Sequence, residues 1–495
     1  MCRIQPGALF AGKYEIGNHM NFILFCADEM RAESLSVYGH PLVKTPSFDR
    51  LAEEGTIFDQ CHVQHTVCSP SRCSLMTGWY PHVSGHRTLW HLLRPHEPSL
   101  FRYLKDAGYH VEWHGKNDLY SEDSFPLCVD RKARASVGHH GGNLSEFGQP
   151  GYYSFLSKPF SGTVEQTSDM QDVMAGIDFL KSRKRDDPPF VLYLPLTMPH
   201  PGYGAPQPFH DMYSTDDIPP LRPAECEEKP VFHSLIRTYR QLDDMVPGTL
   251  EKIQAVYLGM CSCIDRMLGA LMDTLDETGL ADETAVFVYS DHGDWAGDFG
   301  LVEKWPSGLD DTLTRVPLAV RIPQGAEGHR VGEQVELFDI MATVLELAQV
   351  EARHTHFARS LVSQLRGDEG DPERAVFAEG GYDIHEPRCF EGMPVRDDFM
   401  RDPRAKYYPK ALQQQEHPES VQRSVMIRTL RHKLIRRNEG VSELYDLTSD
   451  PRELKNVYGT TGYDQVRASL EQRLLDWYIH TSDTVPWDEN ERGLP

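Results

Sequence analysis

Residues that could do chemistry gather first in the short segment Val67-Cys68-Ser69-Pro70-Ser71-Arg72. A cysteine and an arginine flank a proline here, and Pro70 suits the first turn of the helix-like stretch that follows. Cys68 could therefore be a nucleophile or the precursor of one. A short Cys-x-Pro-x-Arg pattern also arises by chance, so the competing interpretation is a buried structural thiol.

A second set of candidate residues could bind a metal ion. Asp28 and Glu29 follow a continuous apolar run that fits a central strand, and Asp291 and His292 follow another expected strand. Parallel sheets bind ligands at the C-terminal edge of their strands, so these acids should meet there and repel each other without a cation. Oxygen ligands favour a hard ion, whereas a His ligand also suits Mn2+ or Zn2+. The alternative is that Asp28-Glu29 merely begins a solvated loop.

Four cationic side chains accompany these groups: Arg72 in the helix-like stretch after Cys68, and Lys116, His200 and Lys304 elsewhere in the chain. Phosphate and sulfate esters resist nucleophilic attack because their oxygens are anionic, so a site that hydrolyses them needs positive charge on those oxygens. For each of these residues the simpler alternative is a surface salt bridge or a helix cap.

The elements that must position these residues alternate between buried strands and helices. This alternation predicts an α/β fold with a parallel sheet covered by helices on both faces. A later segment alternates in the manner of antiparallel strands and precedes a closing helix, so we predict a catalytic domain over 20–371 and a smaller C-terminal subdomain over 372–495. The expected strands are 21–27, 109–114, 190–196, 285–290 and 316–322, the expected helices are 46–55, 250–278, 337–348 and 463–480, and the antiparallel segment is 425–446.

Composition narrows the class of protein. The chain has 495 residues, of which 40% are hydrophobic, and a formal charge of -24, which argues against a nucleic-acid partner. An anionic substrate would then need a locally positive pocket. The ten cysteines are scattered, and most are expected to be buried thiols. The first apolar run is too short for a signal or membrane segment, so we expect a cytoplasmic enzyme with no membrane association and give the first nineteen residues no structural role.

Cys68-x-Pro70-x-Arg72 followed by Leu75-x-Thr77-Gly78 resembles the signature of the formylglycine-dependent sulfatases of the alkaline-phosphatase superfamily. The resemblance continues along nearly the whole chain. Asp28-Glu29 looks like the family's Asp-Asp pair, and the family's other motifs are matched by Thr45-Pro46-Ser47-Phe48-Asp49-Arg50-Leu51, by Ser290-Asp291-His292-Gly293-Asp294, and by Glu443-Leu444-Tyr445-Asp446-Leu447 with Asp450-Pro451.

The resemblance implies an alkaline-phosphatase-like, mostly parallel sheet between helices, with a short antiparallel sheet in the C-terminal subdomain. A maturation enzyme would oxidise Cys68 to formylglycine, whose hydrate attacks sulfur and later expels sulfate from a formylglycine-sulfate intermediate. The metal would be Ca2+, with Mn2+ or Zn2+ as alternatives. The implied metal ligands are Asp28, Glu29, Cys68, Asp291 and His292, the implied catalytic residues are Cys68, Arg72, Lys116, Asp118, His200 and Lys304, and the implied substrate contacts are Lys116, His200, Lys304 and Trp305.

Two positions depart from the family pattern. Glu29 replaces an Asp, and its longer side chain could bind the metal differently or leave the metal's ligand shell. Asp118 stands where many relatives have the histidine of Gly-Lys-Trp-His, so either Asp118 is a substitute base or another histidine, such as His114, takes that role.

The expected reaction is hydrolysis of a sulfate ester on a small molecule or oligosaccharide, with a carbohydrate sulfate preferred. Aromatic and histidine side chains near the motifs could stack on a sugar, and Trp305 is the best candidate among them, although core packing is the simpler role for most. One rival is a phosphonate monoester or phosphodiester hydrolase of the same superfamily, which His292 favours. Another is a carbohydrate-binding relative in which Cys68 stays a thiol. A homo-oligomer is compatible with all three.

Overall fold

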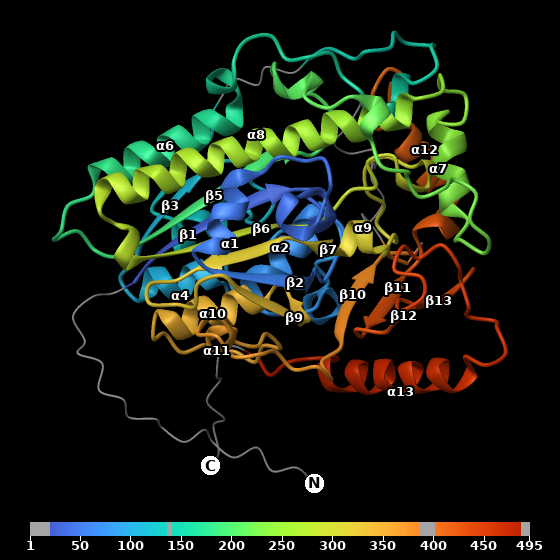
Figure 1. The fold of residues 1–495 in the computed structure, drawn as a ribbon. Coiled ribbons are helices and arrows are strands. Elements are labelled where there is room, and N and C mark those ends of the chain that lie inside the picture. Colours follow the sequence, from blue (N-terminus) through green and yellow to red (C-terminus); the bar gives the residue numbers. More distant parts are fainter. Residues whose placement is uncertain (1–19, 136–140, 384, 387–400, 487–495) are drawn as a thin grey trace, which may run out of the picture.

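The computed structural model describes residues 20–135, 141–383, 385–386 and 401–486, and a nine-stranded sheet crosses its larger part (Figure 1). The order of the strands is β4-β3-β5-β1-β6-β8-β2-β7, and β9 pairs with β2. Strands β3, β4, β5, β1 and β6 run parallel, whereas β8 is antiparallel to both β6 and β2. The strands are β1 (Asn21–Asp28), β2 (Thr56–His62), β3 (His110–His114), β4 (Arg131–Ala133), β5 (Phe190–Pro199), β6 (Thr284–Ser290), β7 (Arg315–Val316), β8 (Leu318–Arg321) and β9 (His329–Glu336).

The central strand β1 is buried along its whole length, and its residues 22–27 are apolar on both faces. Alternate side chains enter two different cores: Ile23 and Phe25 pack on one face of the sheet, and Phe22 and Leu24 on the other. The continuous hydrophobic run therefore predicted the middle of the sheet correctly.

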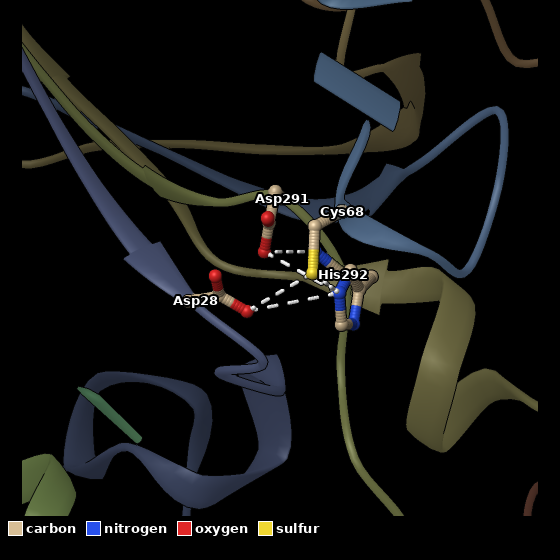
Figure 2. Close-up of side chains that lie close together, drawn as sticks. All are labelled: Asp28, Cys68, Asp291 and His292. Atoms are coloured by element: carbon tan, nitrogen blue, oxygen red, sulfur yellow. Dashed lines mark hydrogen bonds and ion pairs between the residues drawn. The ribbon is translucent and has the colours of Figure 1, made fainter. Parts of the chain in front are cut away.

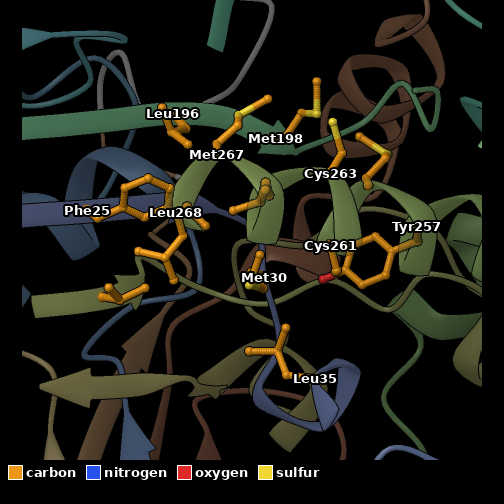
Figure 3. Close-up of a cluster of buried hydrophobic side chains, with 14 of the residues drawn as sticks. Phe25, Met30, Leu35, Leu196, Met198, Tyr257, Cys261, Cys263, Met267 and Leu268 are labelled. Carbon is orange, nitrogen blue, oxygen red and sulfur yellow. The ribbon is translucent and has the colours of Figure 1, made fainter. Parts of the chain in front are cut away.

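Helices cover both faces, as the alternating pattern predicted. One core is closed by α1 (Pro46–Glu53), α6 (Ser168–Ser182) and α8 (Thr249–Thr278), and the other by α2 (Cys68–Thr77), α4 (Leu100–Asp106) and α10 (Asp339–Leu347) (Figure 1). Figure 3 shows side chains of α8, including Met267 and Leu268, against Phe25 of β1 and Leu196 of β5. Helix α8 is long and apolar enough to cross a membrane, but 83% of its most apolar stretch is buried inside the protein, as in a core helix.

A second, four-stranded antiparallel sheet lies in the C-terminal part of the chain, as expected. Its strands are β10 (Val376–Gly380), β11 (Ser424–Arg428), β12 (His432–Arg437) and β13 (Glu443–Asp446), and helix α13 (Asp464–Thr481) packs on it (Figure 1). Helices α7 (Phe232–Arg240) and α12 (Tyr408–Glu416) lie side by side at the upper right of Figure 1, above the second sheet. The division at residue 372 stays a prediction.

One expected strand differs in the structure. The segment 316–322 forms two short strands, β7 and β8, and both pair antiparallel with β2. Pro317 separates them because proline lacks the N–H that continues a strand ladder.

Candidate active site

The ends of β1 and β6 bring the acidic residues together. The two strands are parallel neighbours in which Ala27 faces Ser290, so Asp28 and Asp291 leave the sheet at the same edge. The backbone N–H of Glu29 donates to Asp291 Oδ1 at 3.2 Å. Glu29 has a φ of 68°, a left-handed conformation that is costly for a residue with a side chain. Such a backbone is held only by its surroundings, and here the Tyr257 hydroxyl donates to the Glu29 carbonyl at 2.5 Å.

Cys68 is the first residue of α2, which ends at Gly78 with a φ of 66°. Its Sγ lies 3.2 Å from His292 Nε2 and 3.5 Å from Asp28 Oδ1 (Figure 2). Lys116 Nζ is 3.9 Å from the same sulfur. The cysteine of the sequence motif is therefore surrounded by polar atoms at the sheet edge, which excludes the apolar environment of a structural thiol.

Four potential ligand atoms, from Asp28, Cys68, Asp291 and His292, lie within 4.8 Å of one another (Figure 2). His292 Nε2 is 3.8 Å from Oδ1 of both Asp28 and Asp291. An ion about 2.0–2.6 Å from each ligand spaces neighbouring ligands roughly 3–4 Å apart, so this group has dimensions that fit a divalent cation. The Nδ1 of His292 donates to the Gly293 carbonyl at 2.9 Å, which leaves Nε2 as the ligand atom of the neutral ring.

Glu29 is directed elsewhere. Its Oε1 accepts from Lys304 Nζ at 2.7 Å, and its Oε2 is 3.6 Å from His200 Nε2. Glu29 Oε1 also lies 4.0 Å from Nδ1 of His292 in the first group. The longer side chain thus joins Asp28 and His200 in a second cluster of potential ligand atoms beside the first.

Arg72 bridges the two aspartates. Its Nε donates to Asp291 Oδ2 at 2.8 Å and its Nη2 to Asp28 Oδ2 at 2.9 Å, and all three side chains are fully buried. Lys116 Nζ adds a 2.6 Å contact to Asp28 Oδ2. Arg72 and Lys116 thus balance much of the negative charge of Asp28 and Asp291, so the two acids can lie close together even without a metal ion.

One glycine and one proline explain how Lys116 and His200 reach the site. Gly115 has a φ of 136°, and a Cβ there would lie 2.3 Å from the Pro195 carbonyl oxygen, so only glycine lets the chain pass from β3 to Lys116. Pro199 at the end of β5 pairs with Asp28, which places His200 beside the end of β1.

The pKa values of the buried acids are shifted in opposite directions. Burial opposes ionisation of Asp28, but Lys116 and Arg72 hold its pKa well below the ordinary range. Burial raises the pKa of Glu29, and Lys304 offsets this only in part because Asp294 and Asp28 add negative charge nearby. Of these two adjacent acids, Asp28 therefore loses its proton more readily than Glu29.

The histidines and the thiol are held neutral. Burial, with Lys304 and Lys116 close by, lowers the pKa of His200 well below its ordinary value. Burial also lowers the pKa of His292, and burial together with Asp28 raises the pKa of the Cys68 thiol. A neutral imidazole can bind a metal, whereas a thiol that does not ionise is a poor nucleophile.

The side chains around the site differ in exposure. The side chains of Lys116, Asp118 and His200 are 16%, 19% and 17% exposed, whereas those of Asp28 and Arg72 are fully buried. A ligand can therefore reach the site from the side of Lys116, Asp118 and His200.

The remaining residues named from the sequence lie as follows. Asp118 Oδ2 is 2.8 Å from Lys116 Nζ, so it belongs to the rim of the site. His114 Nε2 is 2.7 Å from Glu112 Oε1, and its side chain is buried. Trp305 is only 1% exposed, and its ring packs near Phe232 and donates to the Ser420 carbonyl at 2.7 Å. The structure thus places the Trp305 ring in the core, which does not support a stacking contact with a sugar.

Sequence reasoning missed several supporting residues. The Ser71 hydroxyl donates to the Asp291 carbonyl at 2.5 Å, and the Tyr203 hydroxyl donates to Asp294 Oδ1 at 2.8 Å. Ser71 and Asp294 stand inside motifs that were already recognised, so their positions carried a signal. Tyr203 and Tyr257 carried none, because only the fold brings a loop and the N-terminal third of α8 to these strand ends.

Comparisons with known proteins agree with this geometry. The sulfatase family model matches residues 20–350, and the model for the C-terminal region of N-sulphoglucosamine sulphohydrolase matches residues 384–479. Similar proteins include the multifunctional alkaline phosphatase superfamily protein PehA of Trinickia caryophylli, which is 25% identical over 94% of this chain and 96% of its own length. The N-acetylglucosamine-6-O-sulfatase of Bacteroides thetaiotaomicron is 24% identical over 96% and 88%, and arylsulfatase K of Bos taurus is 25% identical over 92% and 81%.

Two solved structures share the fold. The phosphonate monoester hydrolase of Agrobacterium radiobacter has a TM-score of 0.75 and 22% identity, covering 93% of this chain and 96% of that one. A protein solved in complex with its substrate D-glucosamine-2-N,6-O-disulfate has a TM-score of 0.73 and 20% identity, covering 95% and 100%. The family model spans most of the chain, and the motif residues meet at one sheet edge. The chain therefore belongs to the sulfatase family, the sulfuric ester hydrolases of the alkaline-phosphatase superfamily.

Proposed function

We propose that the protein hydrolyses a carbohydrate sulfate to the alcohol and inorganic sulfate, using a formylglycine formed from Cys68 beside a divalent metal. The observation that carries the proposal is the group Asp28, Cys68, Asp291 and His292, whose potential ligand atoms lie within 4.8 Å of one another. The relatives named for N-acetylglucosamine-6-O-sulfatase and the neighbour solved with D-glucosamine-2-N,6-O-disulfate support a sugar as the alcohol.

The residues present fit both groups that the family implies. Asp28, Asp291, His292 and residue 68 would hold the metal, which we propose to be Ca2+, with Mn2+ or Zn2+ as alternatives that the imidazole would suit. His292 Nε2, Asp28 Oδ1 and Lys116 Nζ lie 3.2, 3.5 and 3.9 Å from Sγ, and such neighbours suit oxygen atoms better than a thiol. The hydrated aldehyde would supply two hydroxyls, and the bound metal would lower the pKa of the one it touches.

The chain's own cations would neutralise the ester oxygens. Lys116 contacts both Asp28 and residue 68, so it can hold a sulfate oxygen next to the nucleophile. Lys304 and His200 lie on the Glu29 side of the site. Arg72 is buried behind the aspartates, so its part is to keep both carboxylates oriented.

The hydrogen bonds of His200 suggest which group protonates the leaving oxygen. His200 Nδ1 lies 2.6 Å from the Pro201 carbonyl, which can only accept, so Nδ1 carries the proton of the neutral ring. His200 Nε2 then accepts from Lys304 Nζ at 3.1 Å. Lys304 is therefore the proposed proton donor, and His200 orients its ammonium group.

Asp118 is the proposed base for the step that releases sulfate. It contacts Lys116, which in turn contacts residue 68, whereas His114 pairs with Glu112. The geometry thus favours Asp118 over His114 at the position where the family pattern has a histidine.

The proposal is tested with protein matured by a formylglycine-generating enzyme, which we expect to act with it in the cytoplasm. We expect turnover of 4-nitrophenyl sulfate and selective release of sulfate from one member of a panel of sulfated mono- and disaccharides. The Cys68→Ala variant is the control for the nucleophile. A matured, metal-loaded protein without sulfatase activity on any of these esters would refute the proposal.

A phosphonate monoester hydrolase is the second candidate, because His292 contributes an imidazole to the proposed metal group and structures of phosphonate monoester hydrolases share this fold. Turnover of an aryl sulfate and of an aryl phosphonate monoester by the same matured sample distinguishes the two functions. We expect the larger kcat/KM for the sulfate, and a larger value for the phosphonate would make this second function the correct one.

A further inference from the structure

A buried ionic triad lies directly behind Lys304. Glu303 accepts from Arg240 Nη2 at 2.6 Å through Oε2 and from Lys410 Nζ at 2.7 Å through Oε1. The side chains of all three residues are at most 2% exposed. Burial opposes ionisation of Glu303, but Lys410 and Arg240 outweigh it and lower the pKa of this carboxyl. The triad is therefore a buried network of ion pairs centred on the Glu303 carboxylate.

Glu303 is also held through its backbone, which adopts a left-handed conformation with a φ of 65°. Its N–H donates to the Tyr203 hydroxyl at 2.8 Å, and its carbonyl accepts from the Trp295 N–H at 3.2 Å. A conformation of this kind persists only where its surroundings over-determine it. The two side-chain contacts and the two backbone contacts of Glu303 together hold it in this conformation.

The next residue, Lys304, reaches into the site. Its Nζ contacts Glu29 Oε1 at 2.7 Å and His200 Nε2 at 3.1 Å, while its carbonyl lies 3.4 Å from Lys410 Nζ. Lys410 thus contacts two consecutive residues, the side-chain carboxylate of Glu303 and the backbone carbonyl of Lys304, the proposed proton donor. A shift of Lys410 would therefore move the backbone from which the Lys304 side chain extends.

We propose that Lys410 and Arg240, acting through Glu303, are positioning residues for Lys304 in the reaction. The two cations come from different parts of the chain. Arg240 ends α7 and lies within the segment matched by the sulfatase model, whereas Lys410 belongs to α12 and lies within the segment matched by the C-terminal model. The α12 helix packs beside α7 (Figure 1), so the C-terminal region completes the support of a residue in the active site.

This inference rests on the proposed role of Lys304 as proton donor. A positioning role of the triad then differs from a purely structural role in one measurable way. A proton donor matters most when the leaving alcohol is a poor leaving group. Misplacing Lys304 should therefore slow phenyl sulfate more than 4-nitrophenyl sulfate. A network that only stabilises the fold would change both rates by the same factor.

The test compares kcat and KM for these two esters in the wild type, Lys410→Met and Lys410→Arg. We expect Lys410→Met to lower kcat for phenyl sulfate on the order of 100-fold, because small displacements of a catalytic group are this costly, with a clearly smaller loss for 4-nitrophenyl sulfate. Lys410→Arg keeps the charge and should recover most of the loss. Tyr203→Phe releases the Glu303 backbone and should give the same leaving-group pattern if Lys410→Met does not fold.

Lys433→Met is the matched control, because Lys433 is an equally buried lysine that pairs with Asp311 at 2.9 Å and Glu453 at 2.6 Å in the small sheet. It should lower stability and leave the ratio of the two rates unchanged. Equal losses on both esters in Lys410→Met and Tyr203→Phe would overturn the positioning role while the proposed function stands. If the wild type prefers aryl phosphonates, the proposed function fails, and the same pair of leaving groups on phosphonates tests the positioning role.

Discussion

Replacing Arg72 with methionine should destabilise the protein strongly in the absence of metal. The guanidinium contacts Asp291 at 2.8 Å and Asp28 at 2.9 Å, and all three groups are fully buried. Removing one partner of a buried ion pair costs about 3–5 kcal/mol because the other charge is left uncompensated. Asp28 keeps Lys116 at 2.6 Å, and Asp291 keeps the N–H groups of Glu29 and His292, so we expect a loss of about 3 kcal/mol, at the lower end of that range.

A bound divalent ion should reduce this loss. In the variant the ion no longer shares the two carboxylates with a guanidinium, so it should bind at least tenfold more tightly than in the wild type. At saturating metal this reduces the difference in unfolding free energy between the wild type and the variant by about 1.4 kcal/mol or more. Urea unfolding of the wild type and the variant, followed by tryptophan fluorescence, measures the difference in their unfolding free energies once in chelator and once in saturating Ca2+ or Mn2+. The same loss in both conditions would contradict a metal site between Asp28 and Asp291, and no loss in chelator would contradict the role of Arg72 in balancing their charge.

Three further predictions concern the same sheet edge and its surroundings. Cys68→Ala should abolish turnover and change the free energy of unfolding by only about 1 kcal/mol, because few atoms are removed, and measurable turnover in this variant would reject the nucleophile. Asp291→Asn should lose metal and activity together, as determined by elemental analysis and sulfate release, and a variant that keeps stoichiometric metal would show that the ligand set is wrong. His110 and His114 outweigh the effect of burial and lower the pKa of Glu112 from 4.5 to about 2, so this carboxylate contributes stability above pH 4.5 that is lost as the pH falls towards 2. Glu112→Gln should therefore lose less stability than the wild type between pH 4.5 and pH 2 in urea titrations, and parallel curves would contradict the assignment.

The architecture of the large sheet could be predicted because its strands carry simple hydrophobic patterns. The continuous apolar run 22–27 of β1 indicates burial on both faces, and the helical spacing of α8 ends at Gly279 as expected. The division of the segment 316–322 was not predicted although Pro317 marks the break in the sequence. The antiparallel pairing of β7 and β8 with β2 could not be predicted, because it depends on residues more than 200 positions away.

The candidate site divides in the same way. Short motifs indicated that Cys68 and Asp291 lie together, because Cys68 begins α2 and Asp291 directly follows β6. The fold brings these two ends to the same edge of the large sheet. The orientation of Glu29 towards Lys304 could not be read from its neighbours, since it depends on a left-handed backbone and on a lysine 275 residues away. The core position of Trp305 was missed because adjacency to Lys304 in sequence says nothing about the direction of its ring.

The chemical state of residue 68 can be measured directly on protein from its native host. Trypsin should release residues 51–72 as one peptide, which contains Cys61 and Cys68 between the cleavage sites at Arg50 and Arg72. After reduction and alkylation, mass spectrometry should find one alkylated cysteine, Cys61, and an aldehyde at position 68. A peptide with both cysteines alkylated and no aldehyde form would contradict the proposed sulfatase chemistry.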